Sequence, residues 1–110
     1  MAGPPFETPS RRLTEARAAL RPPQPDGEGW AFATAFMACR AGLAGVGPEG
    51  FGDAAADAHT GVIREFVQAD RVPGGAGRSA LVRRARGLGP DDRRVFGEAV
   101  SGLAGWLDRQ

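Results

Sequence analysis

The 110-residue sequence has no tyrosine, lysine or asparagine, and only one histidine and one cysteine. A single cysteine excludes an intramolecular disulfide and any metal centre built from several cysteines. A single histidine means that a metal site would need carboxylates from other helices as its remaining ligands. All 14 basic residues are arginine, and 17 residues are glycine. GC-rich codon usage explains both biases more simply than selection for arginine chemistry, so neither count is used as an argument for function.

Long apolar runs are also absent, with the exception of Trp30–Ala44. This run holds about 15 residues and is interrupted by Arg40, whereas about 20 apolar residues are needed to cross a bilayer. We therefore expect a buried core helix at about 30–44 and no membrane association. Two ridges of this helix can each contact a neighbour. The first ridge is Phe32, Phe36, Cys39 and Leu43, and the second is Trp30, Ala33, Met37, Ala41 and Ala44.

The remaining helices are predicted from apolar spacing of three and four residues and from capping residues. Residues 1–7 are expected to form a flexible N-terminal tail with Phe6 as its anchor, and residues 8–110 a single helical domain. The predicted helices cover about 9–21 (Thr8 as N-cap, Pro9 in the first turn), 30–44 (capped by Asp26), 53–71, a short segment after Ser79 as cap, and 90–108. No strand-like alternation occurs, so the fold class is all-α, a small bundle of four to five helices around the apolar helix.

The predicted helix at 53–71 has one apolar face. This face is formed by Phe51, Ala55, Ala58, Val62, Phe66 and Ala69. The helices at 53–71 and 90–108 are expected to enclose much of the central helix, while the helix at 9–21 either packs at the edge of the bundle or is ordered only by a partner. Two glycine-rich stretches, Gly45–Gly50 and Gly74–Ser79, have spacings that resemble nucleotide-binding loops. Neither follows a strand, so both are interpreted as connections between helices.

His59 and Cys39 are the candidates for site chemistry. His59 titrates near neutral pH and lies beside the apolar stripe of its helix, where a hydrogen-bonded boundary histidine is the simplest interpretation. Cys39 lies on a buried ridge, and a thiol in apolar surroundings carries little thiolate. We predict no catalytic residue, cofactor or metal. A small enzyme or ligand-binding bundle that uses His59 is kept as an alternative.

Charge is distributed unevenly along the chain. Residues 26–70 hold seven carboxylates and two arginines, while residues 71–94 hold seven arginines and two aspartates. A candidate anion or nucleic-acid patch follows: Arg78, Arg83, Arg84, Arg86, Arg93 and Arg94. Basic patches neutralise phosphates. The stretch contains no aromatic residue that could stack on bases, so nucleic acid is the alternative partner, and the two halves of the chain could also attract each other.

The last predicted helix carries small residues at Gly97, Ser101 and Gly105, opposite its apolar face. Such a row allows a second helix to approach closely. Arg40, inside the apolar helix, either marks an edge that reaches water or a place where a partner completes the core. These four residues are the predicted partner interface. The favoured hypothesis is a helical protein-interaction module, either an accessory or regulatory subunit or a homo-oligomer. We expect it in the cytoplasm, because the pair Arg11–Arg12 is not followed by the apolar segment of an export signal.

Overall fold

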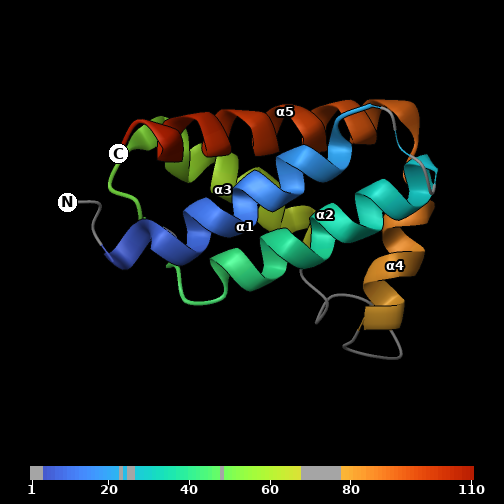
Figure 1. Cartoon of the computed structure of the whole chain (residues 1–110), viewed down its shortest axis with the longest axis horizontal. Helices are drawn as coiled ribbons and strands as arrows, with labels where there is room; N and C mark the ends of the chain where they lie inside the picture. The colour runs from blue at the N-terminus through green and yellow to red at the C-terminus, as the bar shows by residue number, and fades with distance from the viewer. Residues whose placement is uncertain (1–3, 23, 25–26, 48, 68–77) are drawn as a thin grey trace.

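The computed structural model describes residues 4–22, 24, 27–47, 49–67 and 78–110, and this part of the chain is entirely helical apart from turns and loops (Figure 1). The five helices are α1 (Pro4–Leu20), α2 (Glu28–Leu43), α3 (Ala54–Val67), α4 (Arg78–Arg86) and α5 (Pro90–Asp108). The radius of gyration is 13.2 Å, close to the ~13 Å of a compact chain of this length. The all-α prediction is confirmed.

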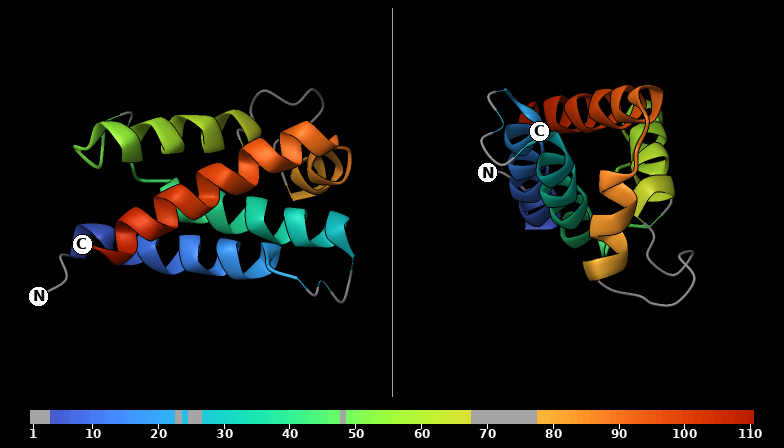
Figure 2. Two further views of the ribbon diagram at one scale, coloured as in Figure 1. Left: turned by 90° about the horizontal axis from the view of Figure 1, so that it is seen from above. Right: turned by 90° about the vertical axis from the view of Figure 1, so that its right-hand side faces the viewer.

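The helices form a bundle in which α1 and α5 run in opposite directions over α2 (Figures 1 and 2). α1 packs along most of α2, and α4 packs against the same helix from another side. α3 packs mainly against α5. In the view from above in Figure 2, α1 and α5 lie together near the C-terminus and diverge toward the other end of the molecule.

Four phenylalanines from three helices form the centre of the core. The rings of Phe36 and Phe96 lie 4.7 Å apart, and Phe66 is 5.5 Å from Phe96. Phe32 completes the group at 5.9 Å from Phe96. The first predicted ridge of α2 is therefore confirmed, because Phe32, Phe36, Cys39 and Leu43 are all buried.

The second predicted ridge of α2 is wrong for most of its members. Ala33 is buried and Met37 half-buried, but Trp30, Ala41 and Ala44 are exposed. Thr34 and Arg40 are exposed as well. The apolar helix thus has one face in solvent, which its hydropathy alone could not reveal because alanine is compatible with either environment.

The N-terminal helix begins earlier than predicted. α1 starts at Pro4, so the expected tail 1–7 is helical from that residue on, and residues 1–3 lie outside the described part of the chain. Prolines are tolerated in a first helical turn, whose N–H groups have no partner within the helix. Pro9 is inside the helix rather than in its first turn. Phe6 anchors this end, with ring centroids 5.4 Å from Phe51 and 5.7 Å from Trp106.

α1 and α2 approach each other closely at Gly42. A Cβ added to Gly42 would lie only 2.6 Å from Cβ of Arg12 and 3.5 Å from Leu13. Glycine at this position lets the two backbones come together. The expectation that α1 packs only at the edge is therefore wrong, and the main helical neighbours of α2 are α1 and α4 rather than α3 and α5.

The predicted apolar face of α3 is right in part: Phe51 is buried and Val62 and Phe66 pack against the core, while Ala69 lies outside the described residues. The buried residues of α3 are Ala56, Thr60, Ile63 and Val67, whereas Ala55 and Ala58 are exposed. Apolar residues occur on both faces, and the burial of Thr60 is possible because its hydroxyl donates to the carbonyl oxygen of Ala56 at 2.9 Å. Of the predicted span 53–71, residues 68–71 lie outside the described part of the chain.

The predicted caps differ from those in the structure, since Thr8 lies inside α1. Asp53 caps α3, since its carboxylate accepts a hydrogen bond from the backbone N–H of Ala56 at 3.0 Å. α2 has Gly27 as its N-cap, with φ of 91°, and the predicted cap Asp26 lies outside the described residues. Ser79 is the second residue of α4 and not its cap.

The glycine-rich stretch Gly45–Gly50 lies in the connection between α2 and α3, as predicted. The guanidinium of Arg64 donates to the carbonyl oxygens of Leu43, at 3.3 Å, and of Val46. The start of this loop is therefore held by the chain itself. The second glycine-rich stretch lies mostly outside the described residues, since only Arg78 and Ser79 of Gly74–Ser79 are included.

Candidate functional site

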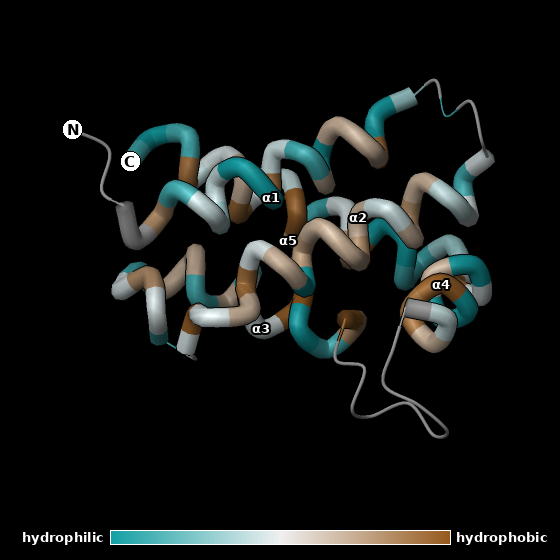
Figure 3. The backbone as a smooth tube through the Cα atoms, turned by 60° about the horizontal axis from the view of Figure 1, so that its bottom comes forward, coloured by the Kyte–Doolittle hydropathy of each residue, from teal (hydrophilic) through white to brown (hydrophobic). Residues whose placement is uncertain are grey.

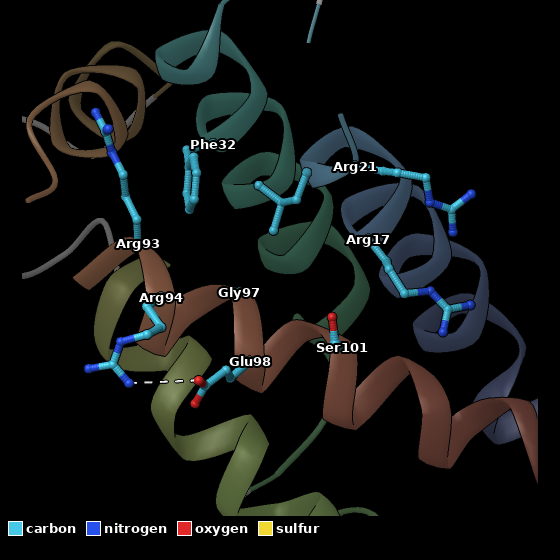
Figure 4. A pocket seen from close by; sticks show the side chains of 9 residues that line it. Arg17, Arg21, Phe32, Arg93, Arg94, Gly97, Glu98 and Ser101 are labelled. Carbon is cyan, nitrogen blue, oxygen red and sulfur yellow. Dashed lines mark ion pairs between the residues drawn. The ribbon is translucent and has the colours of Figure 1, made fainter. Parts of the chain in front are cut away.

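A groove lies between α1 and α5, and α2 contributes Phe32 to its lining (Figure 4). Its volume is about 510 Å³. The lining residues are Arg17, Leu20, Arg21, Phe32, Arg93, Arg94, Gly97, Glu98 and Ser101. At the closed end of the divergence, Phe6 of α1 contacts Trp106 of α5. The aromatic contact holds α1 and α5 together at one end, and at the other end small residues leave the space between them unfilled.

Small and apolar residues form the interior of the groove. Leu20 is half-buried and Phe32 is buried against the core. No atom lies within 4 Å of the position that a Cβ on Gly97 would take. Ser101, one turn further along α5, is exposed. The backbone of α5 is thus accessible along one turn beside an apolar floor.

Arginines dominate the rim, and ion pairs hold most of them in place. Arg17 pairs with Asp108 at 2.9 Å, and Arg93 pairs with Glu28. Arg94 has longer contacts, 3.7 Å to Glu98 and 3.9 Å to Asp91. Figure 4 shows the Arg94–Glu98 pair on the α5 side and Arg17 and Arg21 on the α1 side.

Arg21 differs from the other arginines of the rim. It follows the last residue of α1 and is exposed, and within the described residues no carboxylate pairs with it. Among the described residues that line the groove, Glu98 is the one carboxylate. The rim is accordingly cationic, with Arg21 available to a carboxylate from outside the chain.

The predicted partner interface is divided by the fold. Gly97 and Ser101 line the groove, but Gly105 does not, and a Cβ on Gly105 would approach Arg109 at 3.7 Å. Arg40 is exposed on α2 and is not part of the groove lining. Of the two interpretations offered for Arg40, the structure fits an edge of the helix that reaches water.

The arginines of the predicted patch contact different parts of the fold. Arg84 donates to the carbonyl oxygen of Glu65 at 2.8 Å and so contacts the last turns of α3. Arg93 and Arg94 belong to the groove, and the Arg93–Glu28 pair joins the basic segment to the acidic one. Arg78 begins α4, but its side chain lies outside the described part of the structure.

Arg83 and Arg86 lie beside an exposed aromatic residue that sequence reasoning did not connect with them. Trp30 is 47% exposed, and the guanidinium carbon of Arg86 is 5.9 Å from its ring centroid. Together with Ser79 and Val82 they line a depression of about 420 Å³. We call these five residues the Trp30 pocket. Trp30 is far from the arginines in the sequence, so only the packing of α4 on α2 brings them together.

The two candidates for site chemistry are both used in packing. Burial raises the pKa of the Cys39 thiol to about 12, so the thiolate is scarce at neutral pH, as predicted. The His59 ring lies against α5, where a Cβ on Gly102 would be 2.5 Å from Nε2. Among the described residues no group of three or more His, Cys, Asp or Glu is arranged to hold a metal ion.

The described helices include none with the length and apolar character of a membrane span. Comparisons with protein families, with curated proteins and with solved structures each found no match. The groove and the Trp30 pocket are therefore the two surface features whose lining residues suggest a function.

Proposed function

We propose that this protein is a helical interaction module that binds an acidic amphipathic helix of a partner protein in the groove between α1, α2 and α5. The observation that carries the proposal is the combination of Leu20 and Phe32 as an apolar floor with unfilled space over Gly97. Within the described part of the protein, α5 makes no contact across this space. In the proposed complex, a side chain or a backbone turn of the partner helix fills it.

The partner's chemistry follows from the lining. Small residues such as Gly97 and Ser101, four positions apart on a helix, allow a second helix to approach closely. The floor matches an apolar stripe on that helix. The rim, with four arginines and one glutamate, matches carboxylates on its flanks, because complementary charge promotes association and fixes orientation.

Arg21 is the residue of the rim that we expect to contribute most to recognition. Arg17 and Arg93 already have carboxylate partners within the chain. A carboxylate from the partner would have to compete with these pairs, whereas Arg21 offers a planar guanidinium that can bind a carboxylate through two hydrogen bonds. Reversing its charge should therefore weaken binding more than reversing a remote arginine.

A designed helical peptide provides the test. It should carry leucine and alanine on one face and glutamate on both flanks, and it is titrated into ¹⁵N-labelled protein while amide resonances are followed. We expect the largest shifts at Leu20, Phe32, Gly97 and Ser101. Gly97→Leu fills the groove and should abolish these shifts, and Arg21→Glu should weaken binding at least about tenfold, equivalent to ~1.4 kcal/mol.

Matched controls separate the groove from general effects. Gly61 is also a helical glycine with no atom within 4 Å of an added Cβ, but it lies on α3 outside the groove lining. Gly61→Leu should leave binding unchanged, and so should Arg40→Glu, which reverses an exposed arginine elsewhere on the surface. Equal losses in Gly97→Leu and Gly61→Leu would contradict the proposal.

A further inference from the structure

The Trp30 pocket has a composition that the groove does not share. One stripe of α4 supplies Ser79, Val82, Arg83 and Arg86, which recur at three- and four-residue spacing and therefore lie on one side of the helix. The opposite side of α4 packs into the core through Leu81 and Ala85. In Figure 3 the tube of α4 alternates accordingly between hydrophobic and hydrophilic segments.

Trp30 is unusual in being exposed. Apart from Val95 it is the only large hydrophobic residue that the described structure leaves exposed. The phenylalanine rings Phe32, Phe36 and Phe96, in contrast, are buried against one another in the core. Trp30 lies in the first turn of α2, where α4 covers one side of it. Tryptophan is enriched at interfaces, because its ring is apolar while its N–H can form a hydrogen bond.

The charged residues that the structure describes in the pocket are both cationic. Among the described residues no carboxylate lines it, and neither Arg83 nor Arg86 has an ion pair or a hydrogen bond through its side chain. Arg86 instead lies over the indole ring, a cation–π contact. The hydroxyl of Ser79 adds a neutral donor. These groups can neutralise a phosphate, and their position beside an indole places that charge next to a flat apolar surface.

We propose that the Trp30 pocket binds a nucleoside phosphate, with the base stacked on the Trp30 indole and the phosphate held by Arg83 and Arg86. The volume of about 420 Å³ falls within the ~300–1,000 Å³ of small-molecule sites. Base stacking on aromatic residues together with arginine contacts to the backbone is how proteins bind single strands without sequence preference. The same chemistry fits a free nucleotide and one nucleotide of a single strand.

Two probes distinguish these sources. Adenosine monophosphate and a short single-stranded oligoadenylate are titrated separately at low salt, and the indole N–H resonance of Trp30 is followed in the ¹⁵N-labelled full chain. The protein has two tryptophans, so the resonance is assigned by its loss in Trp30→Phe. If the protein binds the monophosphate and the oligonucleotide with equal affinity, the ligand is a free nucleotide. Much tighter binding of the oligonucleotide indicates a single strand.

Substitutions test the roles of the residues. Trp30→Leu keeps an apolar side chain but removes the flat ring, and should weaken binding about 5- to 150-fold, the equivalent of ~1–3 kcal/mol per stacked base. Trp30→Phe should retain most of the affinity. Arg83→Gln and Arg86→Gln, each made singly, should weaken binding and flatten its salt dependence, whereas Arg40→Gln, on the same helix as Trp30, removes an equal charge outside the pocket and should not.

The proposal is overturned if neither probe moves the Trp30 resonance, or if Trp30→Leu binds as tightly as the wild type. A peptide rich in acidic and aromatic residues that binds the pocket when both nucleotide probes fail would assign it to protein recognition instead. Thermal unfolding of each Trp30 variant is measured alongside binding, because the ring is 47% exposed and the rest of its surface is covered. Gly97→Leu, which blocks the groove, should leave nucleotide binding intact, so this inference and the proposed function succeed or fail separately.

Discussion

Replacing Gly42 by alanine tests the packing of α1 against α2, which is the contact that the sequence alone did not predict. The added Cβ would lie 2.6 Å from Cβ and 3.3 Å from Cγ of Arg12. Both atoms are close to the α1 backbone, so rotating a side chain cannot relieve the contact and the helix itself must move. Overpacking of this kind costs ~1–3 kcal/mol, while the better helix propensity of alanine returns ~1 kcal/mol. We expect a net loss of up to ~2 kcal/mol.

Gly61→Ala is the matched comparison. It makes the same chemical change inside a helix, but its Cβ meets nothing within 4 Å, so only the gain of ~1 kcal/mol in helix propensity remains. Urea unfolding followed by circular dichroism should give a lower midpoint for Gly42→Ala and a higher midpoint for Gly61→Ala than for the wild type. If Gly42→Ala stabilised the protein as much as Gly61→Ala, the close approach of α1 to α2 would be refuted.

Three further predictions concern caps, packing and the thiol. Asp53→Ala removes the side-chain cap of α3 and should lower the free energy of unfolding by ~1 kcal/mol in urea denaturation, whereas an unchanged value would contradict the capping role. Gly102→Ala should stabilise the protein more in a His59→Ala background than in the wild type, because the imidazole occupies the space; additive effects in this double-mutant cycle would show that the ring is elsewhere. Cys39 should react with thiol reagents only as fast as the protein opens. Because its folded pKa of about 12 is above the unfolded value of 9.0, stability should decline as pH rises above 9, and this decline should be absent in Cys39→Ala.

Much of the fold is encoded in apolar spacing that can be recognised without a structure. Leu43 and the phenylalanines of the first α2 ridge are buried as predicted, and α5 matches the predicted span of about 90–108. The errors arise where one residue type fits two environments. Alanines on α2 and α3 are compatible with core and surface, so the buried face was misassigned in part. Gly42 was indistinguishable from the many glycines that composition alone explains, yet it sets the distance between two helices.

The candidate sites were only partly predictable for a different reason. Gly97 and Ser101 were identified from their spacing, and both line the groove. The floor beneath them comes from α1 and α2, and no local pattern relates those segments to α5. Trp30 and Arg86 illustrate the same limit, since the stretch 71–94 has no aromatic residue of its own and acquires one only through the packing of α4. Tertiary contacts between distant segments carry this information.

The most direct test of the proposed function is photo-crosslinking in the cells that produce the protein, with a photoreactive amino acid at Ser101 in the groove or at Ala58 on the exposed surface of α3. The proposed function predicts one dominant crosslinked protein from Ser101, joined through an acidic amphipathic helix, which is lost in Gly97→Leu, retained in Gly61→Leu and absent from Ala58. Crosslinking to the same proteins from both positions, or crosslinking from Ser101 that Gly97→Leu leaves unchanged, would contradict the groove as the binding site.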